Sequence, residues 1–273
     1  MSLIYKANFS DFSVFHSVDE KPKQSDFRMH IHAENEIFLF ISGNATYLVE
    51  GNEYPLSPGS VLIMRRSESH AVNFLSNEPY ERYVINFSDS FVNSIDPEHR
   101  LLEPFYNRAL GSANLYKPNA FAERNKIAIY FKEMCRDDGD SYDKRIRATT
   151  NLFALLADIS QAQKSRSETV RNELASKIID YINSHIFEEL SIPIIANHFY
   201  MSPSQIERVF KKATHSSVWQ YILAKRLATA QSMISDGLSA YTACEACGFG
   251  DYSAFYRAYV KKYGTPPNSS NKK

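Results

Sequence analysis

Two cysteines near the C-terminus, Cys244 and Cys247, have the Cys-x-x-Cys spacing that can serve redox chemistry or metal binding. A zinc site needs two more ligands at suitable spacing, and the neighbouring sequence offers none. The chain holds three cysteines, an odd number that makes no disulfide framework and agrees with a reducing compartment. Because a buried thiol behaves as a small hydrophobic group, core filling is the favoured interpretation of this pair.

Two stretches of sequence each combine a short apolar segment, a break, and a second segment with an arginine and a Lys-Lys pair. The first is LSIPIIANHFYMSPSQIERVFKKA with Arg208, and the second is YTACEACGFGDYSAFYRAYVKKY with Arg257, 49 residues later. Each predicts a helix, a tight turn and a second helix with exposed basic side chains, the layout that places a recognition helix in the DNA major groove. WQYILAKRLATAQSMI, between them, predicts a longer helix that holds the two units at a fixed separation.

The charge distribution supports a polyanionic partner for this end of the chain. The formal net charge is zero, but from Tyr200 onward ten Lys and Arg stand against four Asp and Glu, a net of +6. The preceding residues then carry 21 Lys and Arg against 27 Asp and Glu, a net of −6. Such an asymmetry is typical of a protein that binds nucleic acid through one part only.

The composition and length predict a globular protein of two domains. Of 273 residues, 44% are hydrophobic and 23% charged, which allows real cores. We find no apolar run of membrane-spanning length and no signal peptide, so we expect no membrane partner and a cytoplasmic location. Residues 27–87 predict short antiparallel strands of a barrel or sandwich, because Val, Ile, Phe and Tyr alternate with turn residues. From about Asn119 the pattern becomes helical.

One helical stretch carries an apolar stripe with two interpretations. Its residues lie at i, i+3, i+4 and i+7: Leu152, Leu155, Leu156 and Ile159. The stripe packs on the barrel or pairs with the same helix of a second subunit, and a stripe of one width serves either purpose. We assign it to dimerisation, without excluding that one helix does both. The polar segment 161–173 is the predicted interdomain linker.

The C-terminal hundred residues resemble the AraC/XylS family of bacterial transcription regulators. The match rests on Ala196, Ser202, Arg208, Phe210, Lys211, Arg226, Ala230, Gly248, Phe249, Phe255, Arg257, Gly264 and Pro267. The sequence departs from the family pattern at Tyr200 and His215, which replace glycines, and at Ser270 and Asn271, which replace a closing Tyr-Arg. Histidine tolerates the left-handed backbone of such a turn at some cost, so we expect these changes to affect stability more than function.

The N-terminal half is similar to the cupin-type sensor barrel of the same family. His30, His32, Glu36 and Gly43 match the first cupin motif, and His70 falls where the second motif places its ligand. The second motif is degraded, since Arg65 and Ser67 stand at its usual Pro and Gly positions. The histidines and Glu36 could bind a metal as in cupin enzymes, contact a small ligand, or remain as polar residues of the scaffold.

Of these three interpretations we favour contact with a small effector, and we expect no metal ion or other cofactor. Many regulators of this family bind sugars or related metabolites, and sugar pockets often use aromatic faces. Because the single Trp219 lies in the helical half, the expected platform comes from Tyr47, Phe74 or Tyr83. Phe9, Phe12 and Phe15 lie in an N-terminal arm without an obvious strand partner, which could close over the filled barrel.

The resemblance also assigns the residues expected to touch DNA. Arginine can bind guanine O6 and N7, Glu207 can accept from cytosine N4, and lysines contact phosphates. The expected DNA-binding residues are Ser202, Ser204, Gln205, Glu207, Arg208, Lys211, Lys212, Asp251, Tyr252, Ser253, Tyr256, Arg257 and Lys261, with Lys262 as a further phosphate contact.

These observations predict an α+β multidomain protein that regulates transcription and is not an enzyme. Residues 1–115 form a cupin-like antiparallel β-barrel with an N-terminal arm, 116–164 connecting and dimerisation helices, and 165–273 an all-α domain with two helix-turn-helix units. The expected partners are promoter DNA, a small-molecule effector, RNA polymerase and a second copy of the chain. The alternatives are a metal-dependent cupin enzyme with an appended helical domain, and a ligand-independent DNA-binding protein whose barrel only dimerises.

Overall fold

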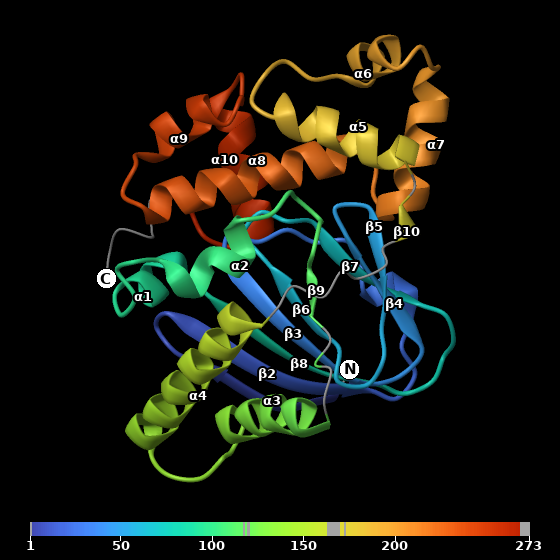
Figure 1. The fold of residues 1–273 in the computed structure, drawn as a ribbon. Coiled ribbons are helices and arrows are strands. Elements are labelled where there is room, and N and C mark those ends of the chain that lie inside the picture. The colour runs from blue at the N-terminus through green and yellow to red at the C-terminus, as the bar shows by residue number, and fades with distance from the viewer. Residues whose placement is uncertain (1, 117, 119–120, 163–169, 172, 268–273) are drawn as a thin grey trace.

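The computed structural model divides into a strand-rich N-terminal half and a helical C-terminal half (Figure 1). It describes residues 2–116, 118, 121–162, 170–171 and 173–267. The predicted linker 161–173 lies mostly outside these residues, as do Ser270 and Asn271. Two of the helices, α3 and α4, pack on the barrel, and the other long helices lie on its opposite side (Figure 1). Among the described residues no helix has the length and apolar character needed to span a membrane.

The strands form two antiparallel sheets, which confirms the predicted barrel. The six-stranded sheet has the order β1-β2-β8-β3-β6-β9, and the four-stranded sheet has the order β10-β5-β4-β7. The strands are β1 (Ser2–Asn8), β2 (Phe12–Asp19), β3 (Asn35–Ser42), β4 (Ala45–Val49), β5 (Asn52–Pro55), β6 (Val61–Met64), β7 (His70–Phe74), β8 (Tyr80–Phe87), β9 (Leu115–Tyr116) and β10 (Val170–Arg171).

Strand β3 is buried on both faces and separates two cores. Because side chains alternate along a strand, Phe38 and Phe40 point between the two sheets, while Ile37 and Leu39 point toward the helices. The core between the sheets is aromatic and also borders the cavity described below. The alternation of side chains along each strand therefore determines which residues of the sheet face the cavity.

The N-terminal segment is part of the six-stranded sheet, which corrects the expectation of an unpaired arm. Strand β2 pairs with β8 along its whole length, from Phe12 opposite Phe87 to Asp19 opposite Tyr80. β1 pairs with β2 on the outer edge. Phe12 is buried against the helix-covered face and Phe9 packs beside it, so neither is available as a lid. The sequence missed this pairing because β2 finds its partner about 70 residues away.

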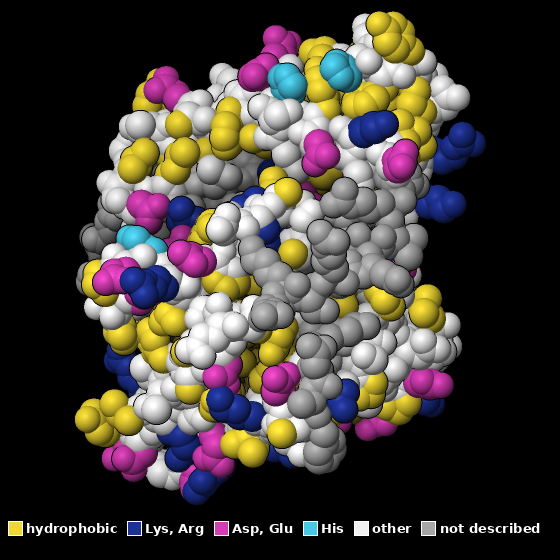
Figure 2. All heavy atoms as spheres, in the orientation of Figure 1, with side chains coloured by type: hydrophobic (Ala, Val, Ile, Leu, Met, Phe, Trp, Pro, Cys, Tyr) yellow, Lys and Arg dark blue, Asp and Glu magenta, His cyan; other side chains and the backbone are white. Residues whose placement is uncertain are grey.

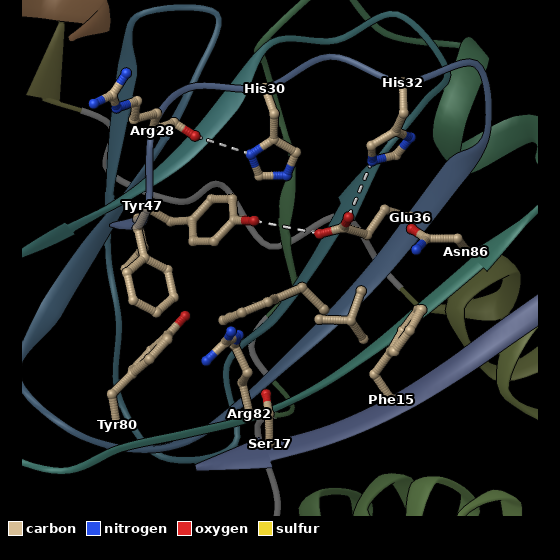
Figure 3. Close-up of a pocket in the computed structure, with 14 residues that line it drawn as sticks. Phe15, Ser17, Arg28, His30, His32, Glu36, Tyr47, Tyr80, Arg82 and Asn86 are labelled. Atoms are coloured by element: carbon tan, nitrogen blue, oxygen red, sulfur yellow. Dashed lines mark hydrogen bonds and ion pairs between the residues drawn. The ribbon is translucent and has the colours of Figure 1, made fainter. Parts of the chain in front are cut away.

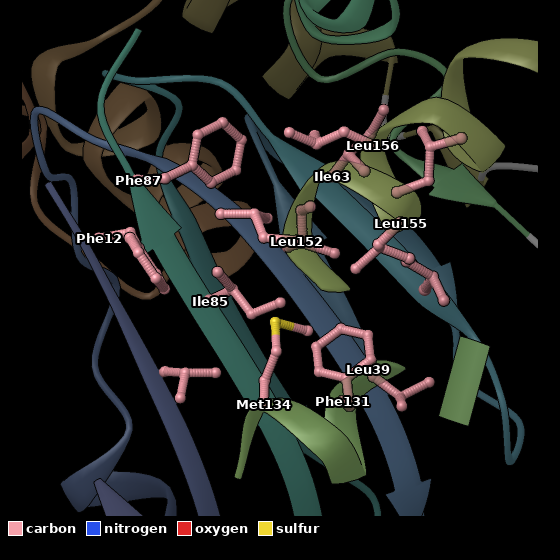
Figure 4. Close-up of a cluster of buried hydrophobic side chains, with 14 of the residues drawn as sticks. Phe12, Leu39, Ile63, Ile85, Phe87, Phe131, Met134, Leu152, Leu155 and Leu156 are labelled. Atoms are coloured by element: carbon pink, nitrogen blue, oxygen red, sulfur yellow. The ribbon is translucent and has the colours of Figure 1, made fainter. Parts of the chain in front are cut away.

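Helices α3 (Phe121–Met134) and α4 (Ser141–Gln161) cover the outer face of the six-stranded sheet (Figures 1 and 4). All four residues of the apolar stripe on α4 are at most 4% exposed: Leu152, Leu155, Leu156 and Ile159. They pack on Ile63, Ile85 and Phe131 within this chain. The dimerisation role assigned to these four side chains is therefore wrong, since a second subunit cannot reach them.

Short helical elements lie in the connections between strands. η1 (Gln24–Asp26) lies between β2 and β3, and α1 (Asp89–Asn93), η2 (Arg100–Leu102) and α2 (Glu103–Tyr106) lie between β8 and β9. Arg108, after α2, forms a buried ion pair with Glu68 at 2.6 Å, and Glu68 also accepts from the main chain of Arg65 and Gly111. This network fixes the loop before β7, and β7 begins with His70, one of the candidate site residues.

The helical half contains two helix-turn-helix units, as the sequence predicts. Helices α5 (Glu173–Ser184), α6 (Ile192–His198) and α7 (Pro203–Thr214) precede the long α8 (Val218–Ser235), followed by α9 (Ala240–Ala246) and α10 (Tyr252–Tyr263). Capping boxes start α7 at Ser202 and α8 at Ser217. Cys244 and Cys247 are buried among apolar side chains of α8, α9 and α10, which confirms their core role.

The positions where the sequence departs from the family glycines carry left-handed backbone. Tyr200, two residues after the end of α6, has φ 54°, and His215, which caps α7, has φ 55°. Gly248, two residues after the end of α9, has φ 71°, and a Cβ there would approach the Phe187 carbonyl oxygen to 2.6 Å. Gly248 therefore cannot be replaced without moving backbone, whereas Tyr200 is 98% exposed and suffers only the backbone cost.

Candidate ligand pocket and DNA-binding surface

A cavity of about 270 Å³ lies between the two sheets of the barrel (Figure 3). Strands β2, β3, β4, β7 and β8 and the segment before β3 supply its walls. The lining residues are Phe15, Ser17, Phe27, Arg28, His30, His32, Glu36, Phe38, Tyr47, Val72, Tyr80, Arg82, Val84 and Asn86. The cavity thus combines an aromatic wall with cationic, anionic and amide side chains, as small-molecule sites do.

His30, His32 and Glu36 line one end of this cavity, and His70 lies against them but does not line it. Their ligand-type atoms all lie within 4.8 Å of one another. His32 Nε2 lies 3.1 Å from Glu36 Oε2, and His70 Nε2 lies 3.4 Å from the same oxygen. Main-chain hydrogen bonds between His30 and His70, 3.0 Å in both directions, join the two motifs. The fold therefore assembles the four residues that the sequence singled out.

The electrostatics of this group follow from burial and from its single carboxylate. Burial disfavours the charged form of Glu36, but His70 and a hydrogen bond with His32 hold its pKa well below the usual range. Burial likewise opposes protonation of His70, yet the Glu36 charge outweighs it and raises the His70 pKa. His30 is exposed, but its ring is packed among neighbouring side chains. The resulting desolvation and the nearby His70 lower the pKa of His30.

Tyr47 is the aromatic residue from the expected platform that lines the cavity. Its hydroxyl donates to Glu36 Oε1 over 3.3 Å, and its ring lies 4.7 Å from that of Phe38. Phe74 packs behind the wall, with its ring 4.9 Å from those of Phe27 and Tyr80, and does not line the cavity. Phe74 therefore supports the platform instead of forming it.

Tyr83 is wrongly assigned to the pocket, because it lies on the opposite face of β8. Its ring stacks on His16 at 4.0 Å and packs near Phe131 of α3. The cavity receives the alternate residues Tyr80, Arg82, Val84 and Asn86. The sequence missed these residues, although the period of two along β8, once its buried face was known, would have found them. Arg82 is already paired with Asp19 at 2.8 Å.

The first recognition helix, α7, presents its polar residues on one exposed face. Ser204, Arg208, Lys211 and Lys212 are exposed, while Ile206 and Phe210 are buried in the core. Lys and Arg side chains project from the edge of the molecule where α7 lies (Figure 2). Ser202 and Gln205 are also exposed, but their side chains complete the capping box. Glu207 is half-buried and accepts from the Val218 main chain at 3.4 Å.

The second recognition helix, α10, has a similar division between faces. Ser253, Tyr256, Arg257 and Lys261 are exposed, and Phe255 and Tyr259 are buried. Asp251 accepts from the main chain of Ser253 and Ala254 and so serves as the helix cap. Tyr252 is half-buried with its ring 5.8 Å from that of Phe255.

Lys262 does not point toward a DNA partner, which corrects the expectation of a phosphate contact. Its Nζ donates to the Ala224 carbonyl of α8 over 3.3 Å. Burial lowers the pKa of this lysine to about 8. The second Lys-Lys pair of the sequence therefore contributes one exposed cation, Lys261, where the first contributes two.

The barrel and the helical half meet at a buried ion pair. Glu50, in the turn after β4, lies 2.5 Å from Nζ of Lys225 on α8, and that Nζ also donates to the Ser67 carbonyl over 2.6 Å. The other donors to the Glu50 carboxylate come from both halves of the chain: Tyr221, Asn183 and the main-chain nitrogen of Ser69. Ile31 of the barrel also packs into the apolar core of α5, α7 and α8. Helix α8, which joins the two units, thus rests directly on the sensor barrel.

Comparison with known proteins matches both halves. A family model for an AraC-like ligand binding domain matches residues 18–113, and one for a helix-turn-helix domain matches residues 195–273. The Msm operon regulatory protein of Streptococcus mutans is 24% identical over 98% of this chain and 95% of its own. The transcriptional activator RhaS of Citrobacter koseri is 22% identical over 93% and 95%. Among solved structures, ToxT from Vibrio cholerae aligns with a TM-score of 0.41 at 19% identity, over 95% and 97%.

The two family models fall on the two parts of the fold that carry the cavity and the recognition helices. The relatives matched over nearly their full length are named as regulators of transcription, not as enzymes, which sets aside the cupin enzyme interpretation. The chain belongs to the AraC/XylS family of transcription regulators, with an N-terminal ligand-binding barrel and a C-terminal helix-turn-helix domain that binds DNA.

Proposed function

We propose that this regulator binds promoter DNA with both helix-turn-helix units and that a small polar metabolite, such as a sugar, in the barrel cavity controls that binding. The observation that carries the proposal is the cavity itself, because it lies in the half that rests on α8. We place this activity in the cytoplasm and, for an activator, beside RNA polymerase. Relatives named as an operon regulatory protein and a transcriptional activator support this role.

The proposed DNA contacts rest on exposure and charge. Arg208 and Arg257 occupy equivalent places on two helices whose opposite faces are buried, so neither arginine has a structural task that competes with base contact. Lys211, Lys212 and Lys261 are exposed nearby and fit phosphate contacts. Asp251, Ser202 and Gln205 already cap helices, so we propose them as weaker contributors that orient the helix starts.

Gel-shift titration with genomic fragments upstream of candidate genes tests the DNA proposal. We expect full-length protein to bind a preferred site with an affinity that falls steeply as salt rises. Lys262→Met is a matched control, because that lysine faces α8. Binding that survives unchanged in both Arg208→Ala and Arg257→Ala would place the DNA surface elsewhere.

The proposed effector is small, because a volume of 270 Å³ lies at the lower end of the range for small-molecule sites. Tyr47 offers an aromatic face, and His30, His32, Glu36 and Asn86 offer hydrogen-bond partners for hydroxyl groups. A monosaccharide or a related metabolite suits this combination of size and chemistry.

A thermal-shift screen against sugars and related metabolites tests the effector proposal, followed by calorimetry with any hit. We expect Tyr47→Leu and His32→Ala to weaken binding. Tyr83→Phe should leave binding unchanged, since that ring lies on the other face of β8. Equal affinity in wild type and both pocket variants would move the ligand out of this cavity.

We also propose that the protein is a homodimer, through a surface other than the leucine stripe. The outer side of α4 exposes Tyr142 and Ile146 by 70% and 49%, one helical turn apart. Sedimentation should show a dimer that Ile146→Glu dissociates, while Asn125→Glu on the exposed side of α3 leaves it intact. Wild-type protein that sediments as a monomer at micromolar concentration would refute the proposal.

A further inference from the structure

The two recognition helices correspond to each other residue by residue. Helices α7 and α10 both have 12 residues, and each residue of α10 lies 49 places after its counterpart in α7. The buried positions agree with this correspondence, and the matched pairs are Ile206 with Phe255 and Phe210 with Tyr259. Lys262 matches the buried Ala213, in agreement with the contact of Lys262 with α8. The exposed faces of the two helices can therefore be compared position by position.

Both helices expose the same row of three side chains. Residues four apart lie on one face of a helix, so each row takes one residue from every turn. The exposed rows are Ser204, Arg208 and Lys212 on α7 and Ser253, Arg257 and Lys261 on α10. Because arginine binds guanine O6 and N7 and lysine binds phosphate, we expect this shared row to make the same contacts in both units.

The row of side chains beside the shared row differs in chemistry between the two helices. Its members are Pro203, Glu207 and Lys211 on α7 and Tyr252, Tyr256 and Val260 on α10. Glu207 and Lys211 carry charges, and the carboxylate of Glu207 also accepts from the Val218 main chain. The matched residues of α10 carry no charge at neutral pH. The first unit thus presents charged groups where the second presents an aromatic and aliphatic surface.

Tyr256 is the exposed member of this aromatic and aliphatic row. It is 40% exposed, whereas Tyr252 and Val260 are half-buried. The ring of Tyr252 lies 6.4 Å from that of Tyr256 and 5.8 Å from that of the buried Phe255, so the domain core supports the row from behind. On α9, Tyr241 extends the aromatic surface, with its ring 5.9 Å from that of Tyr252. The second unit therefore has an aromatic surface directly beside the arginine of the shared row.

We propose that the ring of Tyr256 contacts the C5-methyl group of a thymine in the major groove, so that the two halves of the DNA site differ in sequence. In the major groove the edges of the base pairs offer one apolar group, the thymine methyl, and side chains with apolar surface recognise it. Tyr256 precedes Arg257 on the helix, so this thymine lies beside the guanine that Arg257 binds. At the matched position of α7, Glu207 instead suits cytosine N4.

This inference rests on the proposed DNA binding and deepens it, because it names the base that separates the two half-sites. The shared row predicts a guanine in each half. The differing row predicts that only the half bound by α10 depends on a thymine methyl beside that guanine.

Removal of single methyl groups from the DNA tests the contact. Selection from random duplex DNA with the full-length protein supplies a preferred site, and each thymine of that site is replaced in turn by deoxyuridine. Deoxyuridine lacks the C5-methyl group and keeps the hydrogen-bonding groups of thymine. In gel-shift titration we expect one such replacement to weaken wild-type binding about fourfold, since burial of one methyl-sized group contributes about 0.8 kcal/mol and 1.4 kcal/mol is tenfold.

Variants at position 256 assign the loss to the ring. Tyr256→Phe keeps the ring and should remain sensitive to deoxyuridine, whereas Tyr256→Ser should bind the thymine and deoxyuridine sites equally. Tyr256→Glu introduces the residue type of the matched position on α7 and should behave as Tyr256→Ser does. Glu207→Gln is the matched control, because it changes the other unit and should keep the sensitivity. Thermal unfolding shows which variants are folded, and two ring-deleting variants keep the test decisive if one of them is not.

Several results overturn the proposal. Wild-type binding that no deoxyuridine weakens, a preferred site without thymine, or a sensitivity that persists in a folded Tyr256→Ser or Tyr256→Glu removes the methyl contact. A loss of affinity in Tyr256→Phe without any effect of deoxyuridine makes the hydroxyl a phosphate contact instead. Unchanged DNA binding with lost transcription in Tyr256→Ser assigns the ring to a protein partner.

Failure of the proposed function gives a different result. If the selection enriches no sequence, the proposed DNA binding fails, and the contact of Tyr256 fails with it. If a site is enriched and depends on Arg208 and Arg257 but on no thymine methyl, DNA binding stands and only the role of Tyr256 is removed.

Discussion

Replacement of Glu50 by glutamine should loosen the contact between the barrel and the DNA-binding half. The side chain of Glu50 is 1% exposed and that of Lys225 is 6% exposed, so both charges are out of water. Glutamine keeps the shape of the residue and one carbonyl oxygen but removes the charge. Lys225 is then left as a buried cation with only neutral acceptors, the Ser67 carbonyl and the retained amide oxygen.

The loss of stability differs between the two replacements, because the Glu50 carboxylate has more hydrogen-bond partners than the Lys225 ammonium group. Removing one partner of a buried pair costs about 3 to 5 kcal/mol, and the retained oxygen places Glu50→Gln near 3 kcal/mol. Lys225→Met should cost less, about 1 to 2 kcal/mol, because the carboxylate keeps Tyr221, Asn183 and the Ser69 nitrogen as donors. The double variant should cost less than the sum, with a coupling energy of about 2 kcal/mol.

Urea unfolding followed by Trp219 fluorescence measures this effect in the helical half. The chain has two parts and need not unfold in one step, so the midpoint at this single probe is the quantity compared. With a slope of about 2 to 3 kcal/mol per molar urea, Glu50→Gln should lower the midpoint by about 1 M. An unchanged midpoint in both single variants would refute the argument, because α8 would then not depend on the barrel in solution.

Three further predictions follow from individual side chains. Arg208→Ala and Arg257→Ala should each cost about 1 to 3 kcal/mol of binding at a preferred DNA site, measured by gel shift. Lys262→Met should raise thermal stability at pH 7 and lose this advantage as pH rises from about 8 toward 10.5, because the buried lysine is protonated more weakly in the folded state. Gly248→Ala should destabilise the domain by more than about 2 kcal/mol in urea unfolding, since its Cβ would meet the Phe187 carbonyl.

The helix-turn-helix units were predictable from sequence because their signals are local. Ser202 and Ser217 precede α7 and α8 with a glutamine three residues later, and Asp251 precedes α10. The residues that determine where each helix begins therefore lie within one helical turn. The apolar positions then recur with the helical period, which places Arg208 and Arg257 on exposed faces. Nothing distant in the chain is needed to make these assignments.

The errors concern partners that only tertiary structure supplies. The apolar stripe around Leu152 is equally suited to packing on a sheet or on a second subunit. In the structure it packs on the six-stranded sheet. Strand β2 pairs with the neighbouring β1, a local pairing that the sequence analysis missed, and its other partner, β8, lies far along the chain. Tyr83 was chosen for its ring, but the pairing of β8 turns that ring toward α3.

The contact between the two halves also sets a condition on any effector. A ligand shifts an equilibrium only through a difference in affinity between two states, and one that filled the cavity equally well in both would regulate nothing. The cavity is lined by barrel residues alone, so the difference must come through the barrel segment that α8 touches. Ser67 and Ser69 belong to that segment, since one bonds Lys225 and the other bonds Glu50, and Ile31 packs against the same core beside them. An effector that orders or displaces Ser67 and Ser69 can control DNA binding, and one that leaves them in place cannot act through the Glu50–Lys225 ion pair.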